Sequence, residues 1–288
     1  MEQTGRGIDR VPMVTKVDGG VEPFEERKLR HSLRRSGADE QAIDDIVAEI
    51  NAWIKDGTST TEIYRRARSL LKKRHGTAAV RYSMRRALFN LGPTGFPFED
   101  FLGQLFASQG YRTKTGVTIR GRCVEHEVDL VAYKKDHCFI AEAKFHIHPG
   151  MKSDLQVALY SHARFQDLKG MHLSPNEPCE IVDSYIITNT KFTSAAMEYA
   201  QCVGIKVLSW NFPKEKTLQD HIEEAGIYPI TALTTLSQQG KRMLLEHGIV
   251  LCRDMAGKRD IMRSLGFSPG KIETIIAESV NLCKNPAP

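Results

Sequence analysis

The sequence lacks the features that would place the protein in a membrane or in an oxidising compartment. No apolar run approaches the roughly 20 residues of a membrane-spanning helix, and the first ten residues are too polar for a secretory signal. Only six of the 288 residues are cysteine, and they are too scattered for a zinc pair or a disulfide framework. We therefore expect a cytoplasmic protein without a membrane partner.

A large excess of charge of one sign is also missing. The 40 basic and 35 acidic residues leave a net charge of +5, which permits an anionic partner without establishing one. Hydrophobic residues make up 41% and charged residues 26%, which is ordinary for a globular protein. A chain of this length allows two or three domains.

Three changes of pattern divide the chain. Residues 1–10 have the composition of a flexible tail. Residues 11–92 begin with a short hairpin and continue as helices, until two prolines and two glycines interrupt them in Leu91–Pro97. Residues 93–212 follow the order α-β-β-β-α-β-α-β, and residues 213–288 are helical again. We predict an α/β protein in which a mainly helical N-terminal domain and a helical C-terminal domain flank the α/β core.

The α/β core carries acidic residues inside apolar runs. Asp129 lies in one predicted strand, and Glu142 and Lys144 lie in the next. Side chains alternate along a strand, so Glu142 and Lys144 share a face, and a hairpin around Lys134–Asp136 would bring Asp129 beside Glu142. Two carboxylates this close repel each other and favour a divalent cation between them. The alternative is a salt bridge of Lys144 at a sheet edge.

These residues resemble a known signature. Asp129 followed by Glu142-Ala143-Lys144 is similar to the D…(D/E)-x-K motif of the restriction-endonuclease-like PD-(D/E)xK superfamily, and to its Mrr-like branch in particular. The resemblance covers residues 93–210. It implies an α-β-β-β-α-β core in which Asp129 and Glu142 bind Mg²⁺ or Mn²⁺ and Lys144 assists catalysis.

Further residues fit this resemblance. Glu99, in the helix that opens the core, matches an acid that many members carry there, and it is expected to complete a second metal site. Gln156 and Tyr160 match a Q-x-x-x-Y element after the motif strand. They lie on one helical face, where Gln156 is expected to position Lys144 or the phosphate.

Residues 11–92 resemble the ATP-cone domain, a small nucleotide-binding module. The resemblance rests on the Gly-containing opening from Val14 to Gly19 and on Val80-Arg81-Tyr82. It implies ATP or dATP as a regulatory ligand, although Val17 stands where the family usually has a cation that contacts phosphate. A purely structural domain is the alternative. The residues implied in binding are Lys16, Asp18, Gly19, Lys28, Arg81 and Tyr82.

The C-terminal region shows a looser resemblance. Residues 229–282 are similar to a helix-hairpin-helix pair of the kind found in repair nucleases, with Gly248 and Gly266 at the two turns. Each turn lacks the second glycine of the usual G-h-G sequence. A helical packing or dimerisation module is the alternative interpretation.

Together these patterns predict a metal-dependent DNA endonuclease that ATP or dATP regulates. Double-strand cutting by one site per chain would require a homodimer. Two other functions remain open. One is a nucleotide-responsive DNA-binding regulator with an inactive nuclease core, and the other is a junction-resolving repair nuclease.

Overall fold

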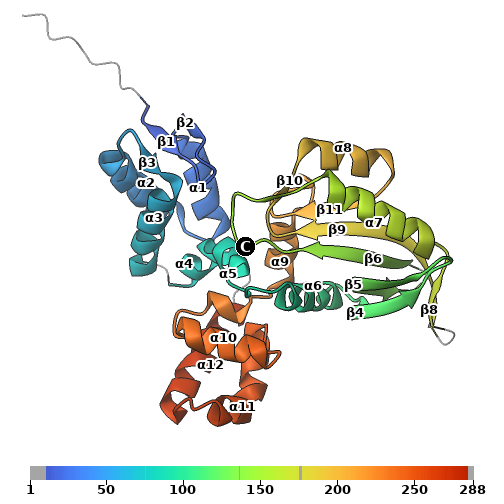
Figure 1. Ribbon diagram of the computed structural model, residues 1–288. Coiled ribbons are helices and arrows are strands. Elements are labelled where there is room, and N and C mark those ends of the chain that lie inside the picture. Colours follow the sequence, from blue (N-terminus) through green and yellow to red (C-terminus); the bar gives the residue numbers. More distant parts are fainter. Residues whose placement is uncertain (1–10, 75, 136, 175–176, 285–288) are drawn as a thin grey trace, which may run out of the picture. The chain divides into compact units, whose positions relative to one another are not determined.

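The chain forms two compact units that divide between Ser83 and Met84. Figure 1 shows the computed structural model, which describes residues 11–74, 76–135, 137–174 and 177–284. The tail predicted at residues 1–10 lies outside the described residues. The division falls inside the predicted first domain, and the predicted C-terminal domain belongs to the second unit. No helix in the described part of the chain is long and apolar enough to cross a membrane.

The first unit combines a small sheet with helices around an apolar core. The sheet has the strand order β2-β1-β3, in which β1 pairs antiparallel with β2 and parallel with β3. The two-residue strand β3 was not predicted. The elements are β1 (Met13–Thr15), β2 (Val21–Pro23), α1 (Glu26–Arg35), α2 (Glu40–Trp53), β3 (Thr58–Ser59), α3 (Thr60–Arg74) and α4 (Gly76–Tyr82).

Local signals explain where these helices begin and end. The side chain of Asp39 accepts a hydrogen bond from the Ala42 backbone and thereby caps α2. The helical stretch predicted before Leu91 is interrupted: it forms two helices, α4 and α5 (Met84–Phe89), with a break at Ser83. The Ser83 hydroxyl donates to the Ala79 carbonyl and accepts from Nε of Arg68 at 2.5 Å. This side-chain bonding competes with the helical pattern where the helix stops.

The second unit is built on a mixed six-stranded sheet. Its main path is β11-β9-β6-β5-β4, in which β4, β5 and β6 are antiparallel neighbours and β6, β9 and β11 run parallel. The chain is therefore of mixed α/β class, as predicted. The strands are β4 (Arg112–Arg120), β5 (Glu125–Lys134), β6 (His137–Lys144), β8 (His172–Ser174), β9 (Glu177–Thr188) and β11 (Lys206–Ser209), with short β7 (Lys152–Ser153) and β10 (Lys191–Phe192) paired apart from them.

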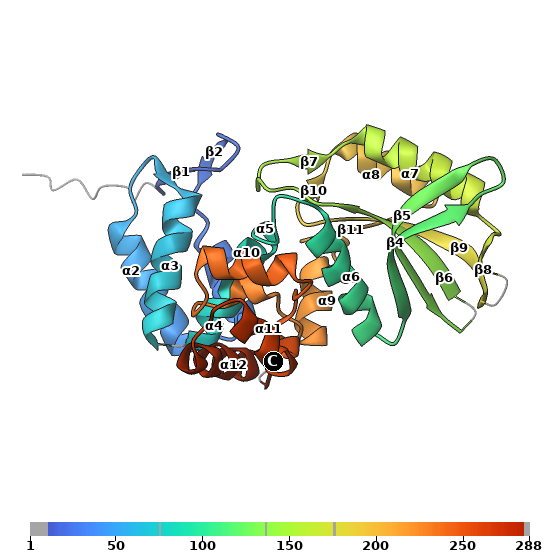
Figure 2. The ribbon, with the colours of Figure 1, turned by 60° about the horizontal axis from the view of Figure 1, so that its bottom comes forward.

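Helices cover both faces of this sheet (Figures 1 and 2). On one face lie α6 (Phe96–Ser108) and α9 (Leu218–Ala225), and on the other α7 (Leu155–Leu168) and α8 (Ser194–Cys202). Phe165 and Leu168 of α7 pack against Val131 and Ile140 of the sheet. Strand β6 is buried on both faces, which explains its nearly continuous apolar sequence.

The C-terminal helices form a bundle in which a carboxylate ties a loop to the last helix. The Glu278 carboxylate accepts from the backbone N–H and hydroxyl groups of both Thr234 and Thr235, at 2.5–2.9 Å. Gly240 packs against the Phe267 ring, where a Cβ would approach within 3.2 Å. The elements are η1 (Ile230–Ala232), α10 (Gln238–Glu246), η2 (Cys252–Lys258), α11 (Arg259–Ser264) and α12 (Pro269–Lys284).

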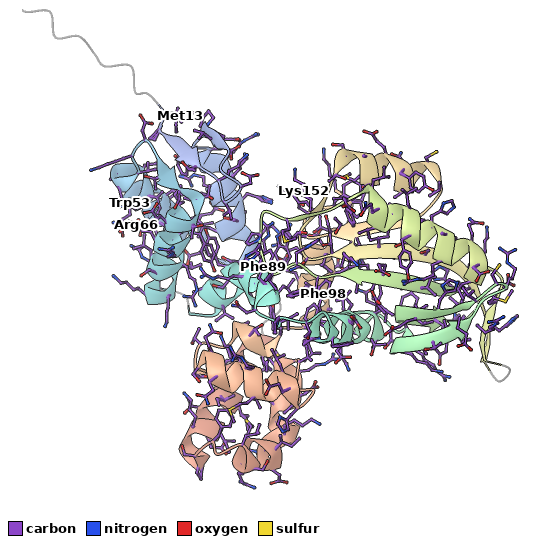
Figure 3. The ribbon with its side chains drawn as sticks, viewed as in Figure 1. Met13, Trp53, Arg66, Phe89, Phe98 and Lys152 are labelled. Atoms are coloured by element: carbon purple, nitrogen blue, oxygen red, sulfur yellow. The ribbon has the colours of Figure 1, made fainter. Side chains whose placement is uncertain are left out.

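Phe98 anchors the start of α6 beneath the end of β6. Its side chain is fully buried, and its ring centroid lies 5.6 Å from that of Phe145 (Figure 3 labels Phe98). We predict that Phe98→Ala lowers the unfolding free energy of the second unit by about 3–5 kcal/mol, because the cavity cannot close fully. Urea denaturation would measure this change. Phe96→Ala is the matched control: that ring is 66% exposed, so a change within about 0.5 kcal/mol is expected. Equal losses in the two variants would contradict the anchoring role.

Candidate functional site

The predicted acidic residues meet where strands β5 and β6 separate. The ladder between these strands runs from Lys134 opposite His137 to Leu130 opposite Ala141. Beyond it, Oδ2 of Asp129 accepts a hydrogen bond from the Ala143 backbone N–H at 2.7 Å. The Asp129 carboxylate thus accepts a hydrogen bond that a backbone carbonyl would accept within the ladder. We call this point, where β5 and β6 separate, the fork. This hydrogen bond places Asp129 beside the Glu142–Ala143 segment, where the hairpin was expected to bring it.

A glycine in the neighbouring strand marks the same point. Thr115 pairs with Leu130 and Val117 with Val128, so Gly116 stands opposite Asp129. Its φ of +58° is left-handed, a conformation that favours glycine. Thr115 approaches α6 on one face, whereas Val117 packs with the apolar cluster on the other face. The strand therefore changes phase beside Asp129, as an irregular strand does next to many active sites.

Glu142 is buried between two cations. Its side chain is only 8% exposed, and its Oε2 accepts from Nη1 of Arg164 at 2.6 Å. Its Oε1 lies 3.3 Å from Nζ of Lys144, two residues along the same strand face. A buried carboxylate needs such compensation, because desolvation of an unpaired charge is costly.

Two acids of the site, Asp129 and Glu99, have raised pKa values. Burial and then the charge of Glu142 raise the pKa of Asp129 to about 6, although the Ala143 N–H and the two cations oppose this. Burial and then the charge of Asp129 raise the pKa of Glu99, at the start of α6, to about 7. Glu99 therefore belongs electrostatically to this cluster, as its place on α6 predicted. Perturbed carboxyl groups of this kind are frequent at functional sites.

Arg164 is the site residue that the sequence analysis missed. It lies on α7, eight positions after Gln156 and four after Tyr160, so the three occupy one helical stripe. The Arg164 guanidinium sits 4.5 Å from the centre of the Tyr160 ring. Gln156 is exposed, and its side chain makes no hydrogen bond within the described part of the chain. Of these three residues of α7, it is therefore Arg164 and not Gln156 that contacts Glu142.

The donor set fits a hard cation that retains water ligands. Asp129 and Glu142 offer carboxylate oxygens, and the Ala143 carbonyl lies between Glu142 and Lys144 in the same strand. Among the described residues, no three His, Cys, Asp or Glu side chains lie close enough together to hold one metal ion. Mg²⁺ is commonly bound by one or two carboxylates, with waters and substrate phosphates completing its shell. Two carboxylates are therefore sufficient for Mg²⁺ or Mn²⁺.

The residues predicted for nucleotide binding form a charged cluster in the first unit. Nζ of Lys16 lies 2.5 Å from Glu22, and Nζ of Lys28 lies 3.6 Å from Glu22 and 2.6 Å from Glu25. Between β1 and β2, Asp18 accepts from the Gly20 backbone, and Gly19 has a φ of +84°. Both predicted lysines are thus held by glutamates at one end of the hairpin.

Two arginines of the first unit have buried donors without acceptors. Nε and Nη2 of Arg81 and Nε of Arg66 are buried and have no hydrogen-bond partner among the described residues. Arg66 lies over the Trp53 ring at 5.0 Å (Figure 3). The neighbouring Tyr82 stacks on Tyr64 with ring centroids 5.3 Å apart, and burial raises the pKa of Tyr82 to about 12. Such orphaned donors call for an explanation, and a bound anion is one.

Comparison with known proteins identifies relatives of the chain. An Archaeoglobus fulgidus protein described as uncharacterized is 35% identical over 179 residues, which cover 62% of this chain and 97% of that protein. Residues 228–283 match the family AF1548-like, C-terminal. The chain belongs to the AF1548-like family.

A solved structure extends the likeness to three dimensions. The crystal structure of AF1548, described as a protein of unknown function, is 32% identical and has a TM-score of 0.55. The match covers 66% of this chain and 99% of AF1548. A structure of Can2 from Sulfobacillus thermosulfidooxidans with cyclic tetra-adenylate gives a TM-score of only 0.27 at 12% identity, too low to indicate a shared fold. The AF1548-like relatives thus share sequence and fold with this chain, and their descriptions assign no activity.

The raised pKa of Glu99 predicts a pH-dependent stability in this AF1548-like protein. The folded protein holds its proton to higher pH than the unfolded chain does, so stability falls as the pH rises through about 7. In metal-free buffer, Glu99→Gln should be more stable than wild type at pH 8, with the difference disappearing near pH 4. Urea denaturation across this range measures it. The exposed Glu198→Gln, on α8, is the control and should show no such trend. A Glu99→Gln difference that does not vary with pH would contradict the assignment.

Proposed function

We propose that the second unit is a metal-dependent DNA endonuclease with a restriction-endonuclease-like core. The observation that carries this proposal is the meeting of Asp129, Glu142 and Lys144 at the fork between β5 and β6. The element order supports it: apart from the short strands β7 and β8, the chain runs α6-β4-β5-β6-α7-β9, the α-β-β-β-α-β order that the sequence resemblance implies. DNA is the substrate that the same resemblance implies.

The protein residues divide the chemistry among them. Asp129 and Glu142 would hold Mg²⁺ or Mn²⁺, which polarises a phosphate and lowers the pKa of a bound water. Lys144 is 43% exposed, so its ammonium can reach a phosphate or a water from the side of the sheet where Glu142 lies. There it orients the attacking water and stabilises the negative charge that develops on the phosphate. Glu99, whose pKa is raised to about 7, would accept or release a proton close to neutral pH.

Two alternatives share this site and differ in substrate or activity. An inactive nuclease core within a DNA-binding regulator would bind DNA without cutting it. A junction-resolving nuclease would cut four-way DNA in preference to linear DNA. Incubation with linear, methylated and four-way DNA separates them, and sedimentation tests the proposed homodimer.

We predict that Lys144→Ala reduces plasmid nicking with Mg²⁺ by about 100–1000-fold, because its charge acts mainly in the transition state. The fold and most of the DNA affinity should remain, as measured by circular dichroism and a filter-binding assay. Lys169→Ala, an exposed lysine at the far end of α7, is the matched control and should cut at the wild-type rate. If Lys144→Ala cuts as fast as Lys169→Ala, the active site is wrongly assigned.

We further propose that the first unit is an ATP-cone-like domain that binds ATP or dATP. The buried, unpaired donors of Arg66 and Arg81 favour an anionic ligand in this unit. Lys16 and Lys28 supply additional cations beside the Gly19 turn. Regulation would follow only if the nucleotide binds the active and inactive arrangements with different affinity.

We predict that Lys16→Ala weakens ATP or dATP binding about 10–100-fold, the loss expected for a charge-assisted hydrogen bond to phosphate. Calorimetric titration of the full chain measures this loss, and parallel nicking assays show whether the nucleotide changes the cleavage rate. Lys55→Ala, an exposed lysine of the same unit, should bind like wild type. Nucleotide that fails to bind wild type, or that binds without changing cleavage, would remove the regulatory proposal.

A further inference from the structure

The two cations on Glu142 differ in how firmly they are held. Arg164 is 7% exposed, and its guanidinium lies beneath the Tyr160 ring. Its Nε is buried and has no hydrogen-bond partner among the described residues, so the bond to Glu142 is its main polar contact. Separating the pair would leave the buried Arg164 charge uncompensated and Glu142 with only one of its two cations, which is destabilising. Arg164 is therefore a fixed partner of Oε2.

Lys144 is a looser partner of the other oxygen. Its Nζ lies 3.3 Å from Oε1, longer than the 2.6 Å contact of Arg164, and its side chain is 43% exposed. Its ammonium can turn toward solvent or toward a phosphate, and Glu142 then still has the Arg164 guanidinium as its partner. Oε1 can therefore exchange its partner, whereas Oε2 cannot.

The two carboxylate oxygens of Asp129 also differ in their partners. Its Oδ2 accepts from the Ala143 N–H at 2.7 Å. In the described part of the chain this is the one side-chain hydrogen bond of Asp129, and it uses Oδ2 alone. Each carboxylate thus has one oxygen held by the protein and one left for a ligand.

We propose that Arg164 is a positioning residue that makes Glu142 a single-oxygen ligand and thereby favours Mg²⁺ or Mn²⁺ over Ca²⁺. The inference rests on the proposed nuclease function, since it concerns the metal site of that function. Mg²⁺ requires a near-octahedral shell at short distances, whereas Ca²⁺ accepts more oxygens and often takes both from one carboxylate. Because the Arg164 guanidinium donates to Oε2 and places a positive charge beside it, binding of Ca²⁺ through both oxygens of Glu142 is disfavoured.

The test is a calorimetric titration of the full chain with MnCl₂ and with CaCl₂. Wild type is expected to bind Mn²⁺ more tightly than Ca²⁺. Arg164→Met removes a charge that repels both cations and also frees Oε2, so the Ca²⁺ affinity should gain more than the Mn²⁺ affinity. The Mn²⁺/Ca²⁺ affinity ratio therefore decreases. Arg164→Lys keeps the charge and supports folding, but its ammonium is one bond shorter and lacks the planar fork, so the ratio should decrease there by less.

Lys206→Met is the matched control. Lys206 pairs with Asp183 at 2.6 Å in the same sheet, so the variant removes an ion pair outside the site and should leave the ratio unchanged. A wild-type ratio in Arg164→Met, or in Arg164→Lys if the former does not fold, would overturn the role of Arg164. Nicking by wild type in the same experiment keeps the two questions apart. If wild type nicks DNA but the Mn²⁺/Ca²⁺ affinity ratio of the Arg164 variant equals that of wild type, only this inference is refuted. If wild type neither binds Mn²⁺ nor nicks DNA, both the proposed function and this inference are refuted.

Discussion

The repulsion between Asp129 and Glu142 is the constraint on which the rest of the site depends. Both carboxylates lie at a fork between two strands, and Glu142 is almost completely buried. Without compensation such a pair would either take up a proton or prevent the sheet from folding. The protein compensates it with the Ala143 N–H, the Lys144 ammonium and the Arg164 guanidinium. The last of these comes from a different element and requires the tertiary fold.

That requirement explains why α7 packs as it does. Its buried positions Ala158, Ser161, Phe165 and Leu168 follow a helical spacing, and Arg164 lies within the same stripe. Phe165 and Leu168 bury apolar surface against the sheet, which fixes the rotation of the helix about its axis. That rotation directs the residue before Phe165 toward Glu142. Apolar packing therefore sets the position of a charge.

The sequence alone predicted those positions of the site residues that depend on the alternation of side chains along a strand. It placed Glu142 and Lys144 on one face and Asp129 opposite Glu142, because strand parity and a short hairpin leave little freedom. It did not find Arg164, because a cation on a helix is normally solvated and only the packed fold shows that this one is buried. The spacing of Gln156, Tyr160 and Arg164 was the available signal. The break at Ser83 was missed for a similar reason, since it depends on Arg68 from another helix.

Charge balance links these observations to the metal. Asp129 and Glu142 against Lys144 and Arg164 sum to zero, and Glu99, with a pKa of about 7, is about half protonated near neutral pH. The net charge of the cluster is therefore close to zero without a metal, so the second unit can fold before a metal binds. In the proposed function a divalent cation would add two positive charges, and loss of the Glu99 proton and rotation of Lys144 away from Oε1 would both oppose that excess. Metal binding commonly releases protons in this way. Arg164 takes no part in the adjustment because it is buried, and so the ligand geometry can stay fixed while the charge of the site changes.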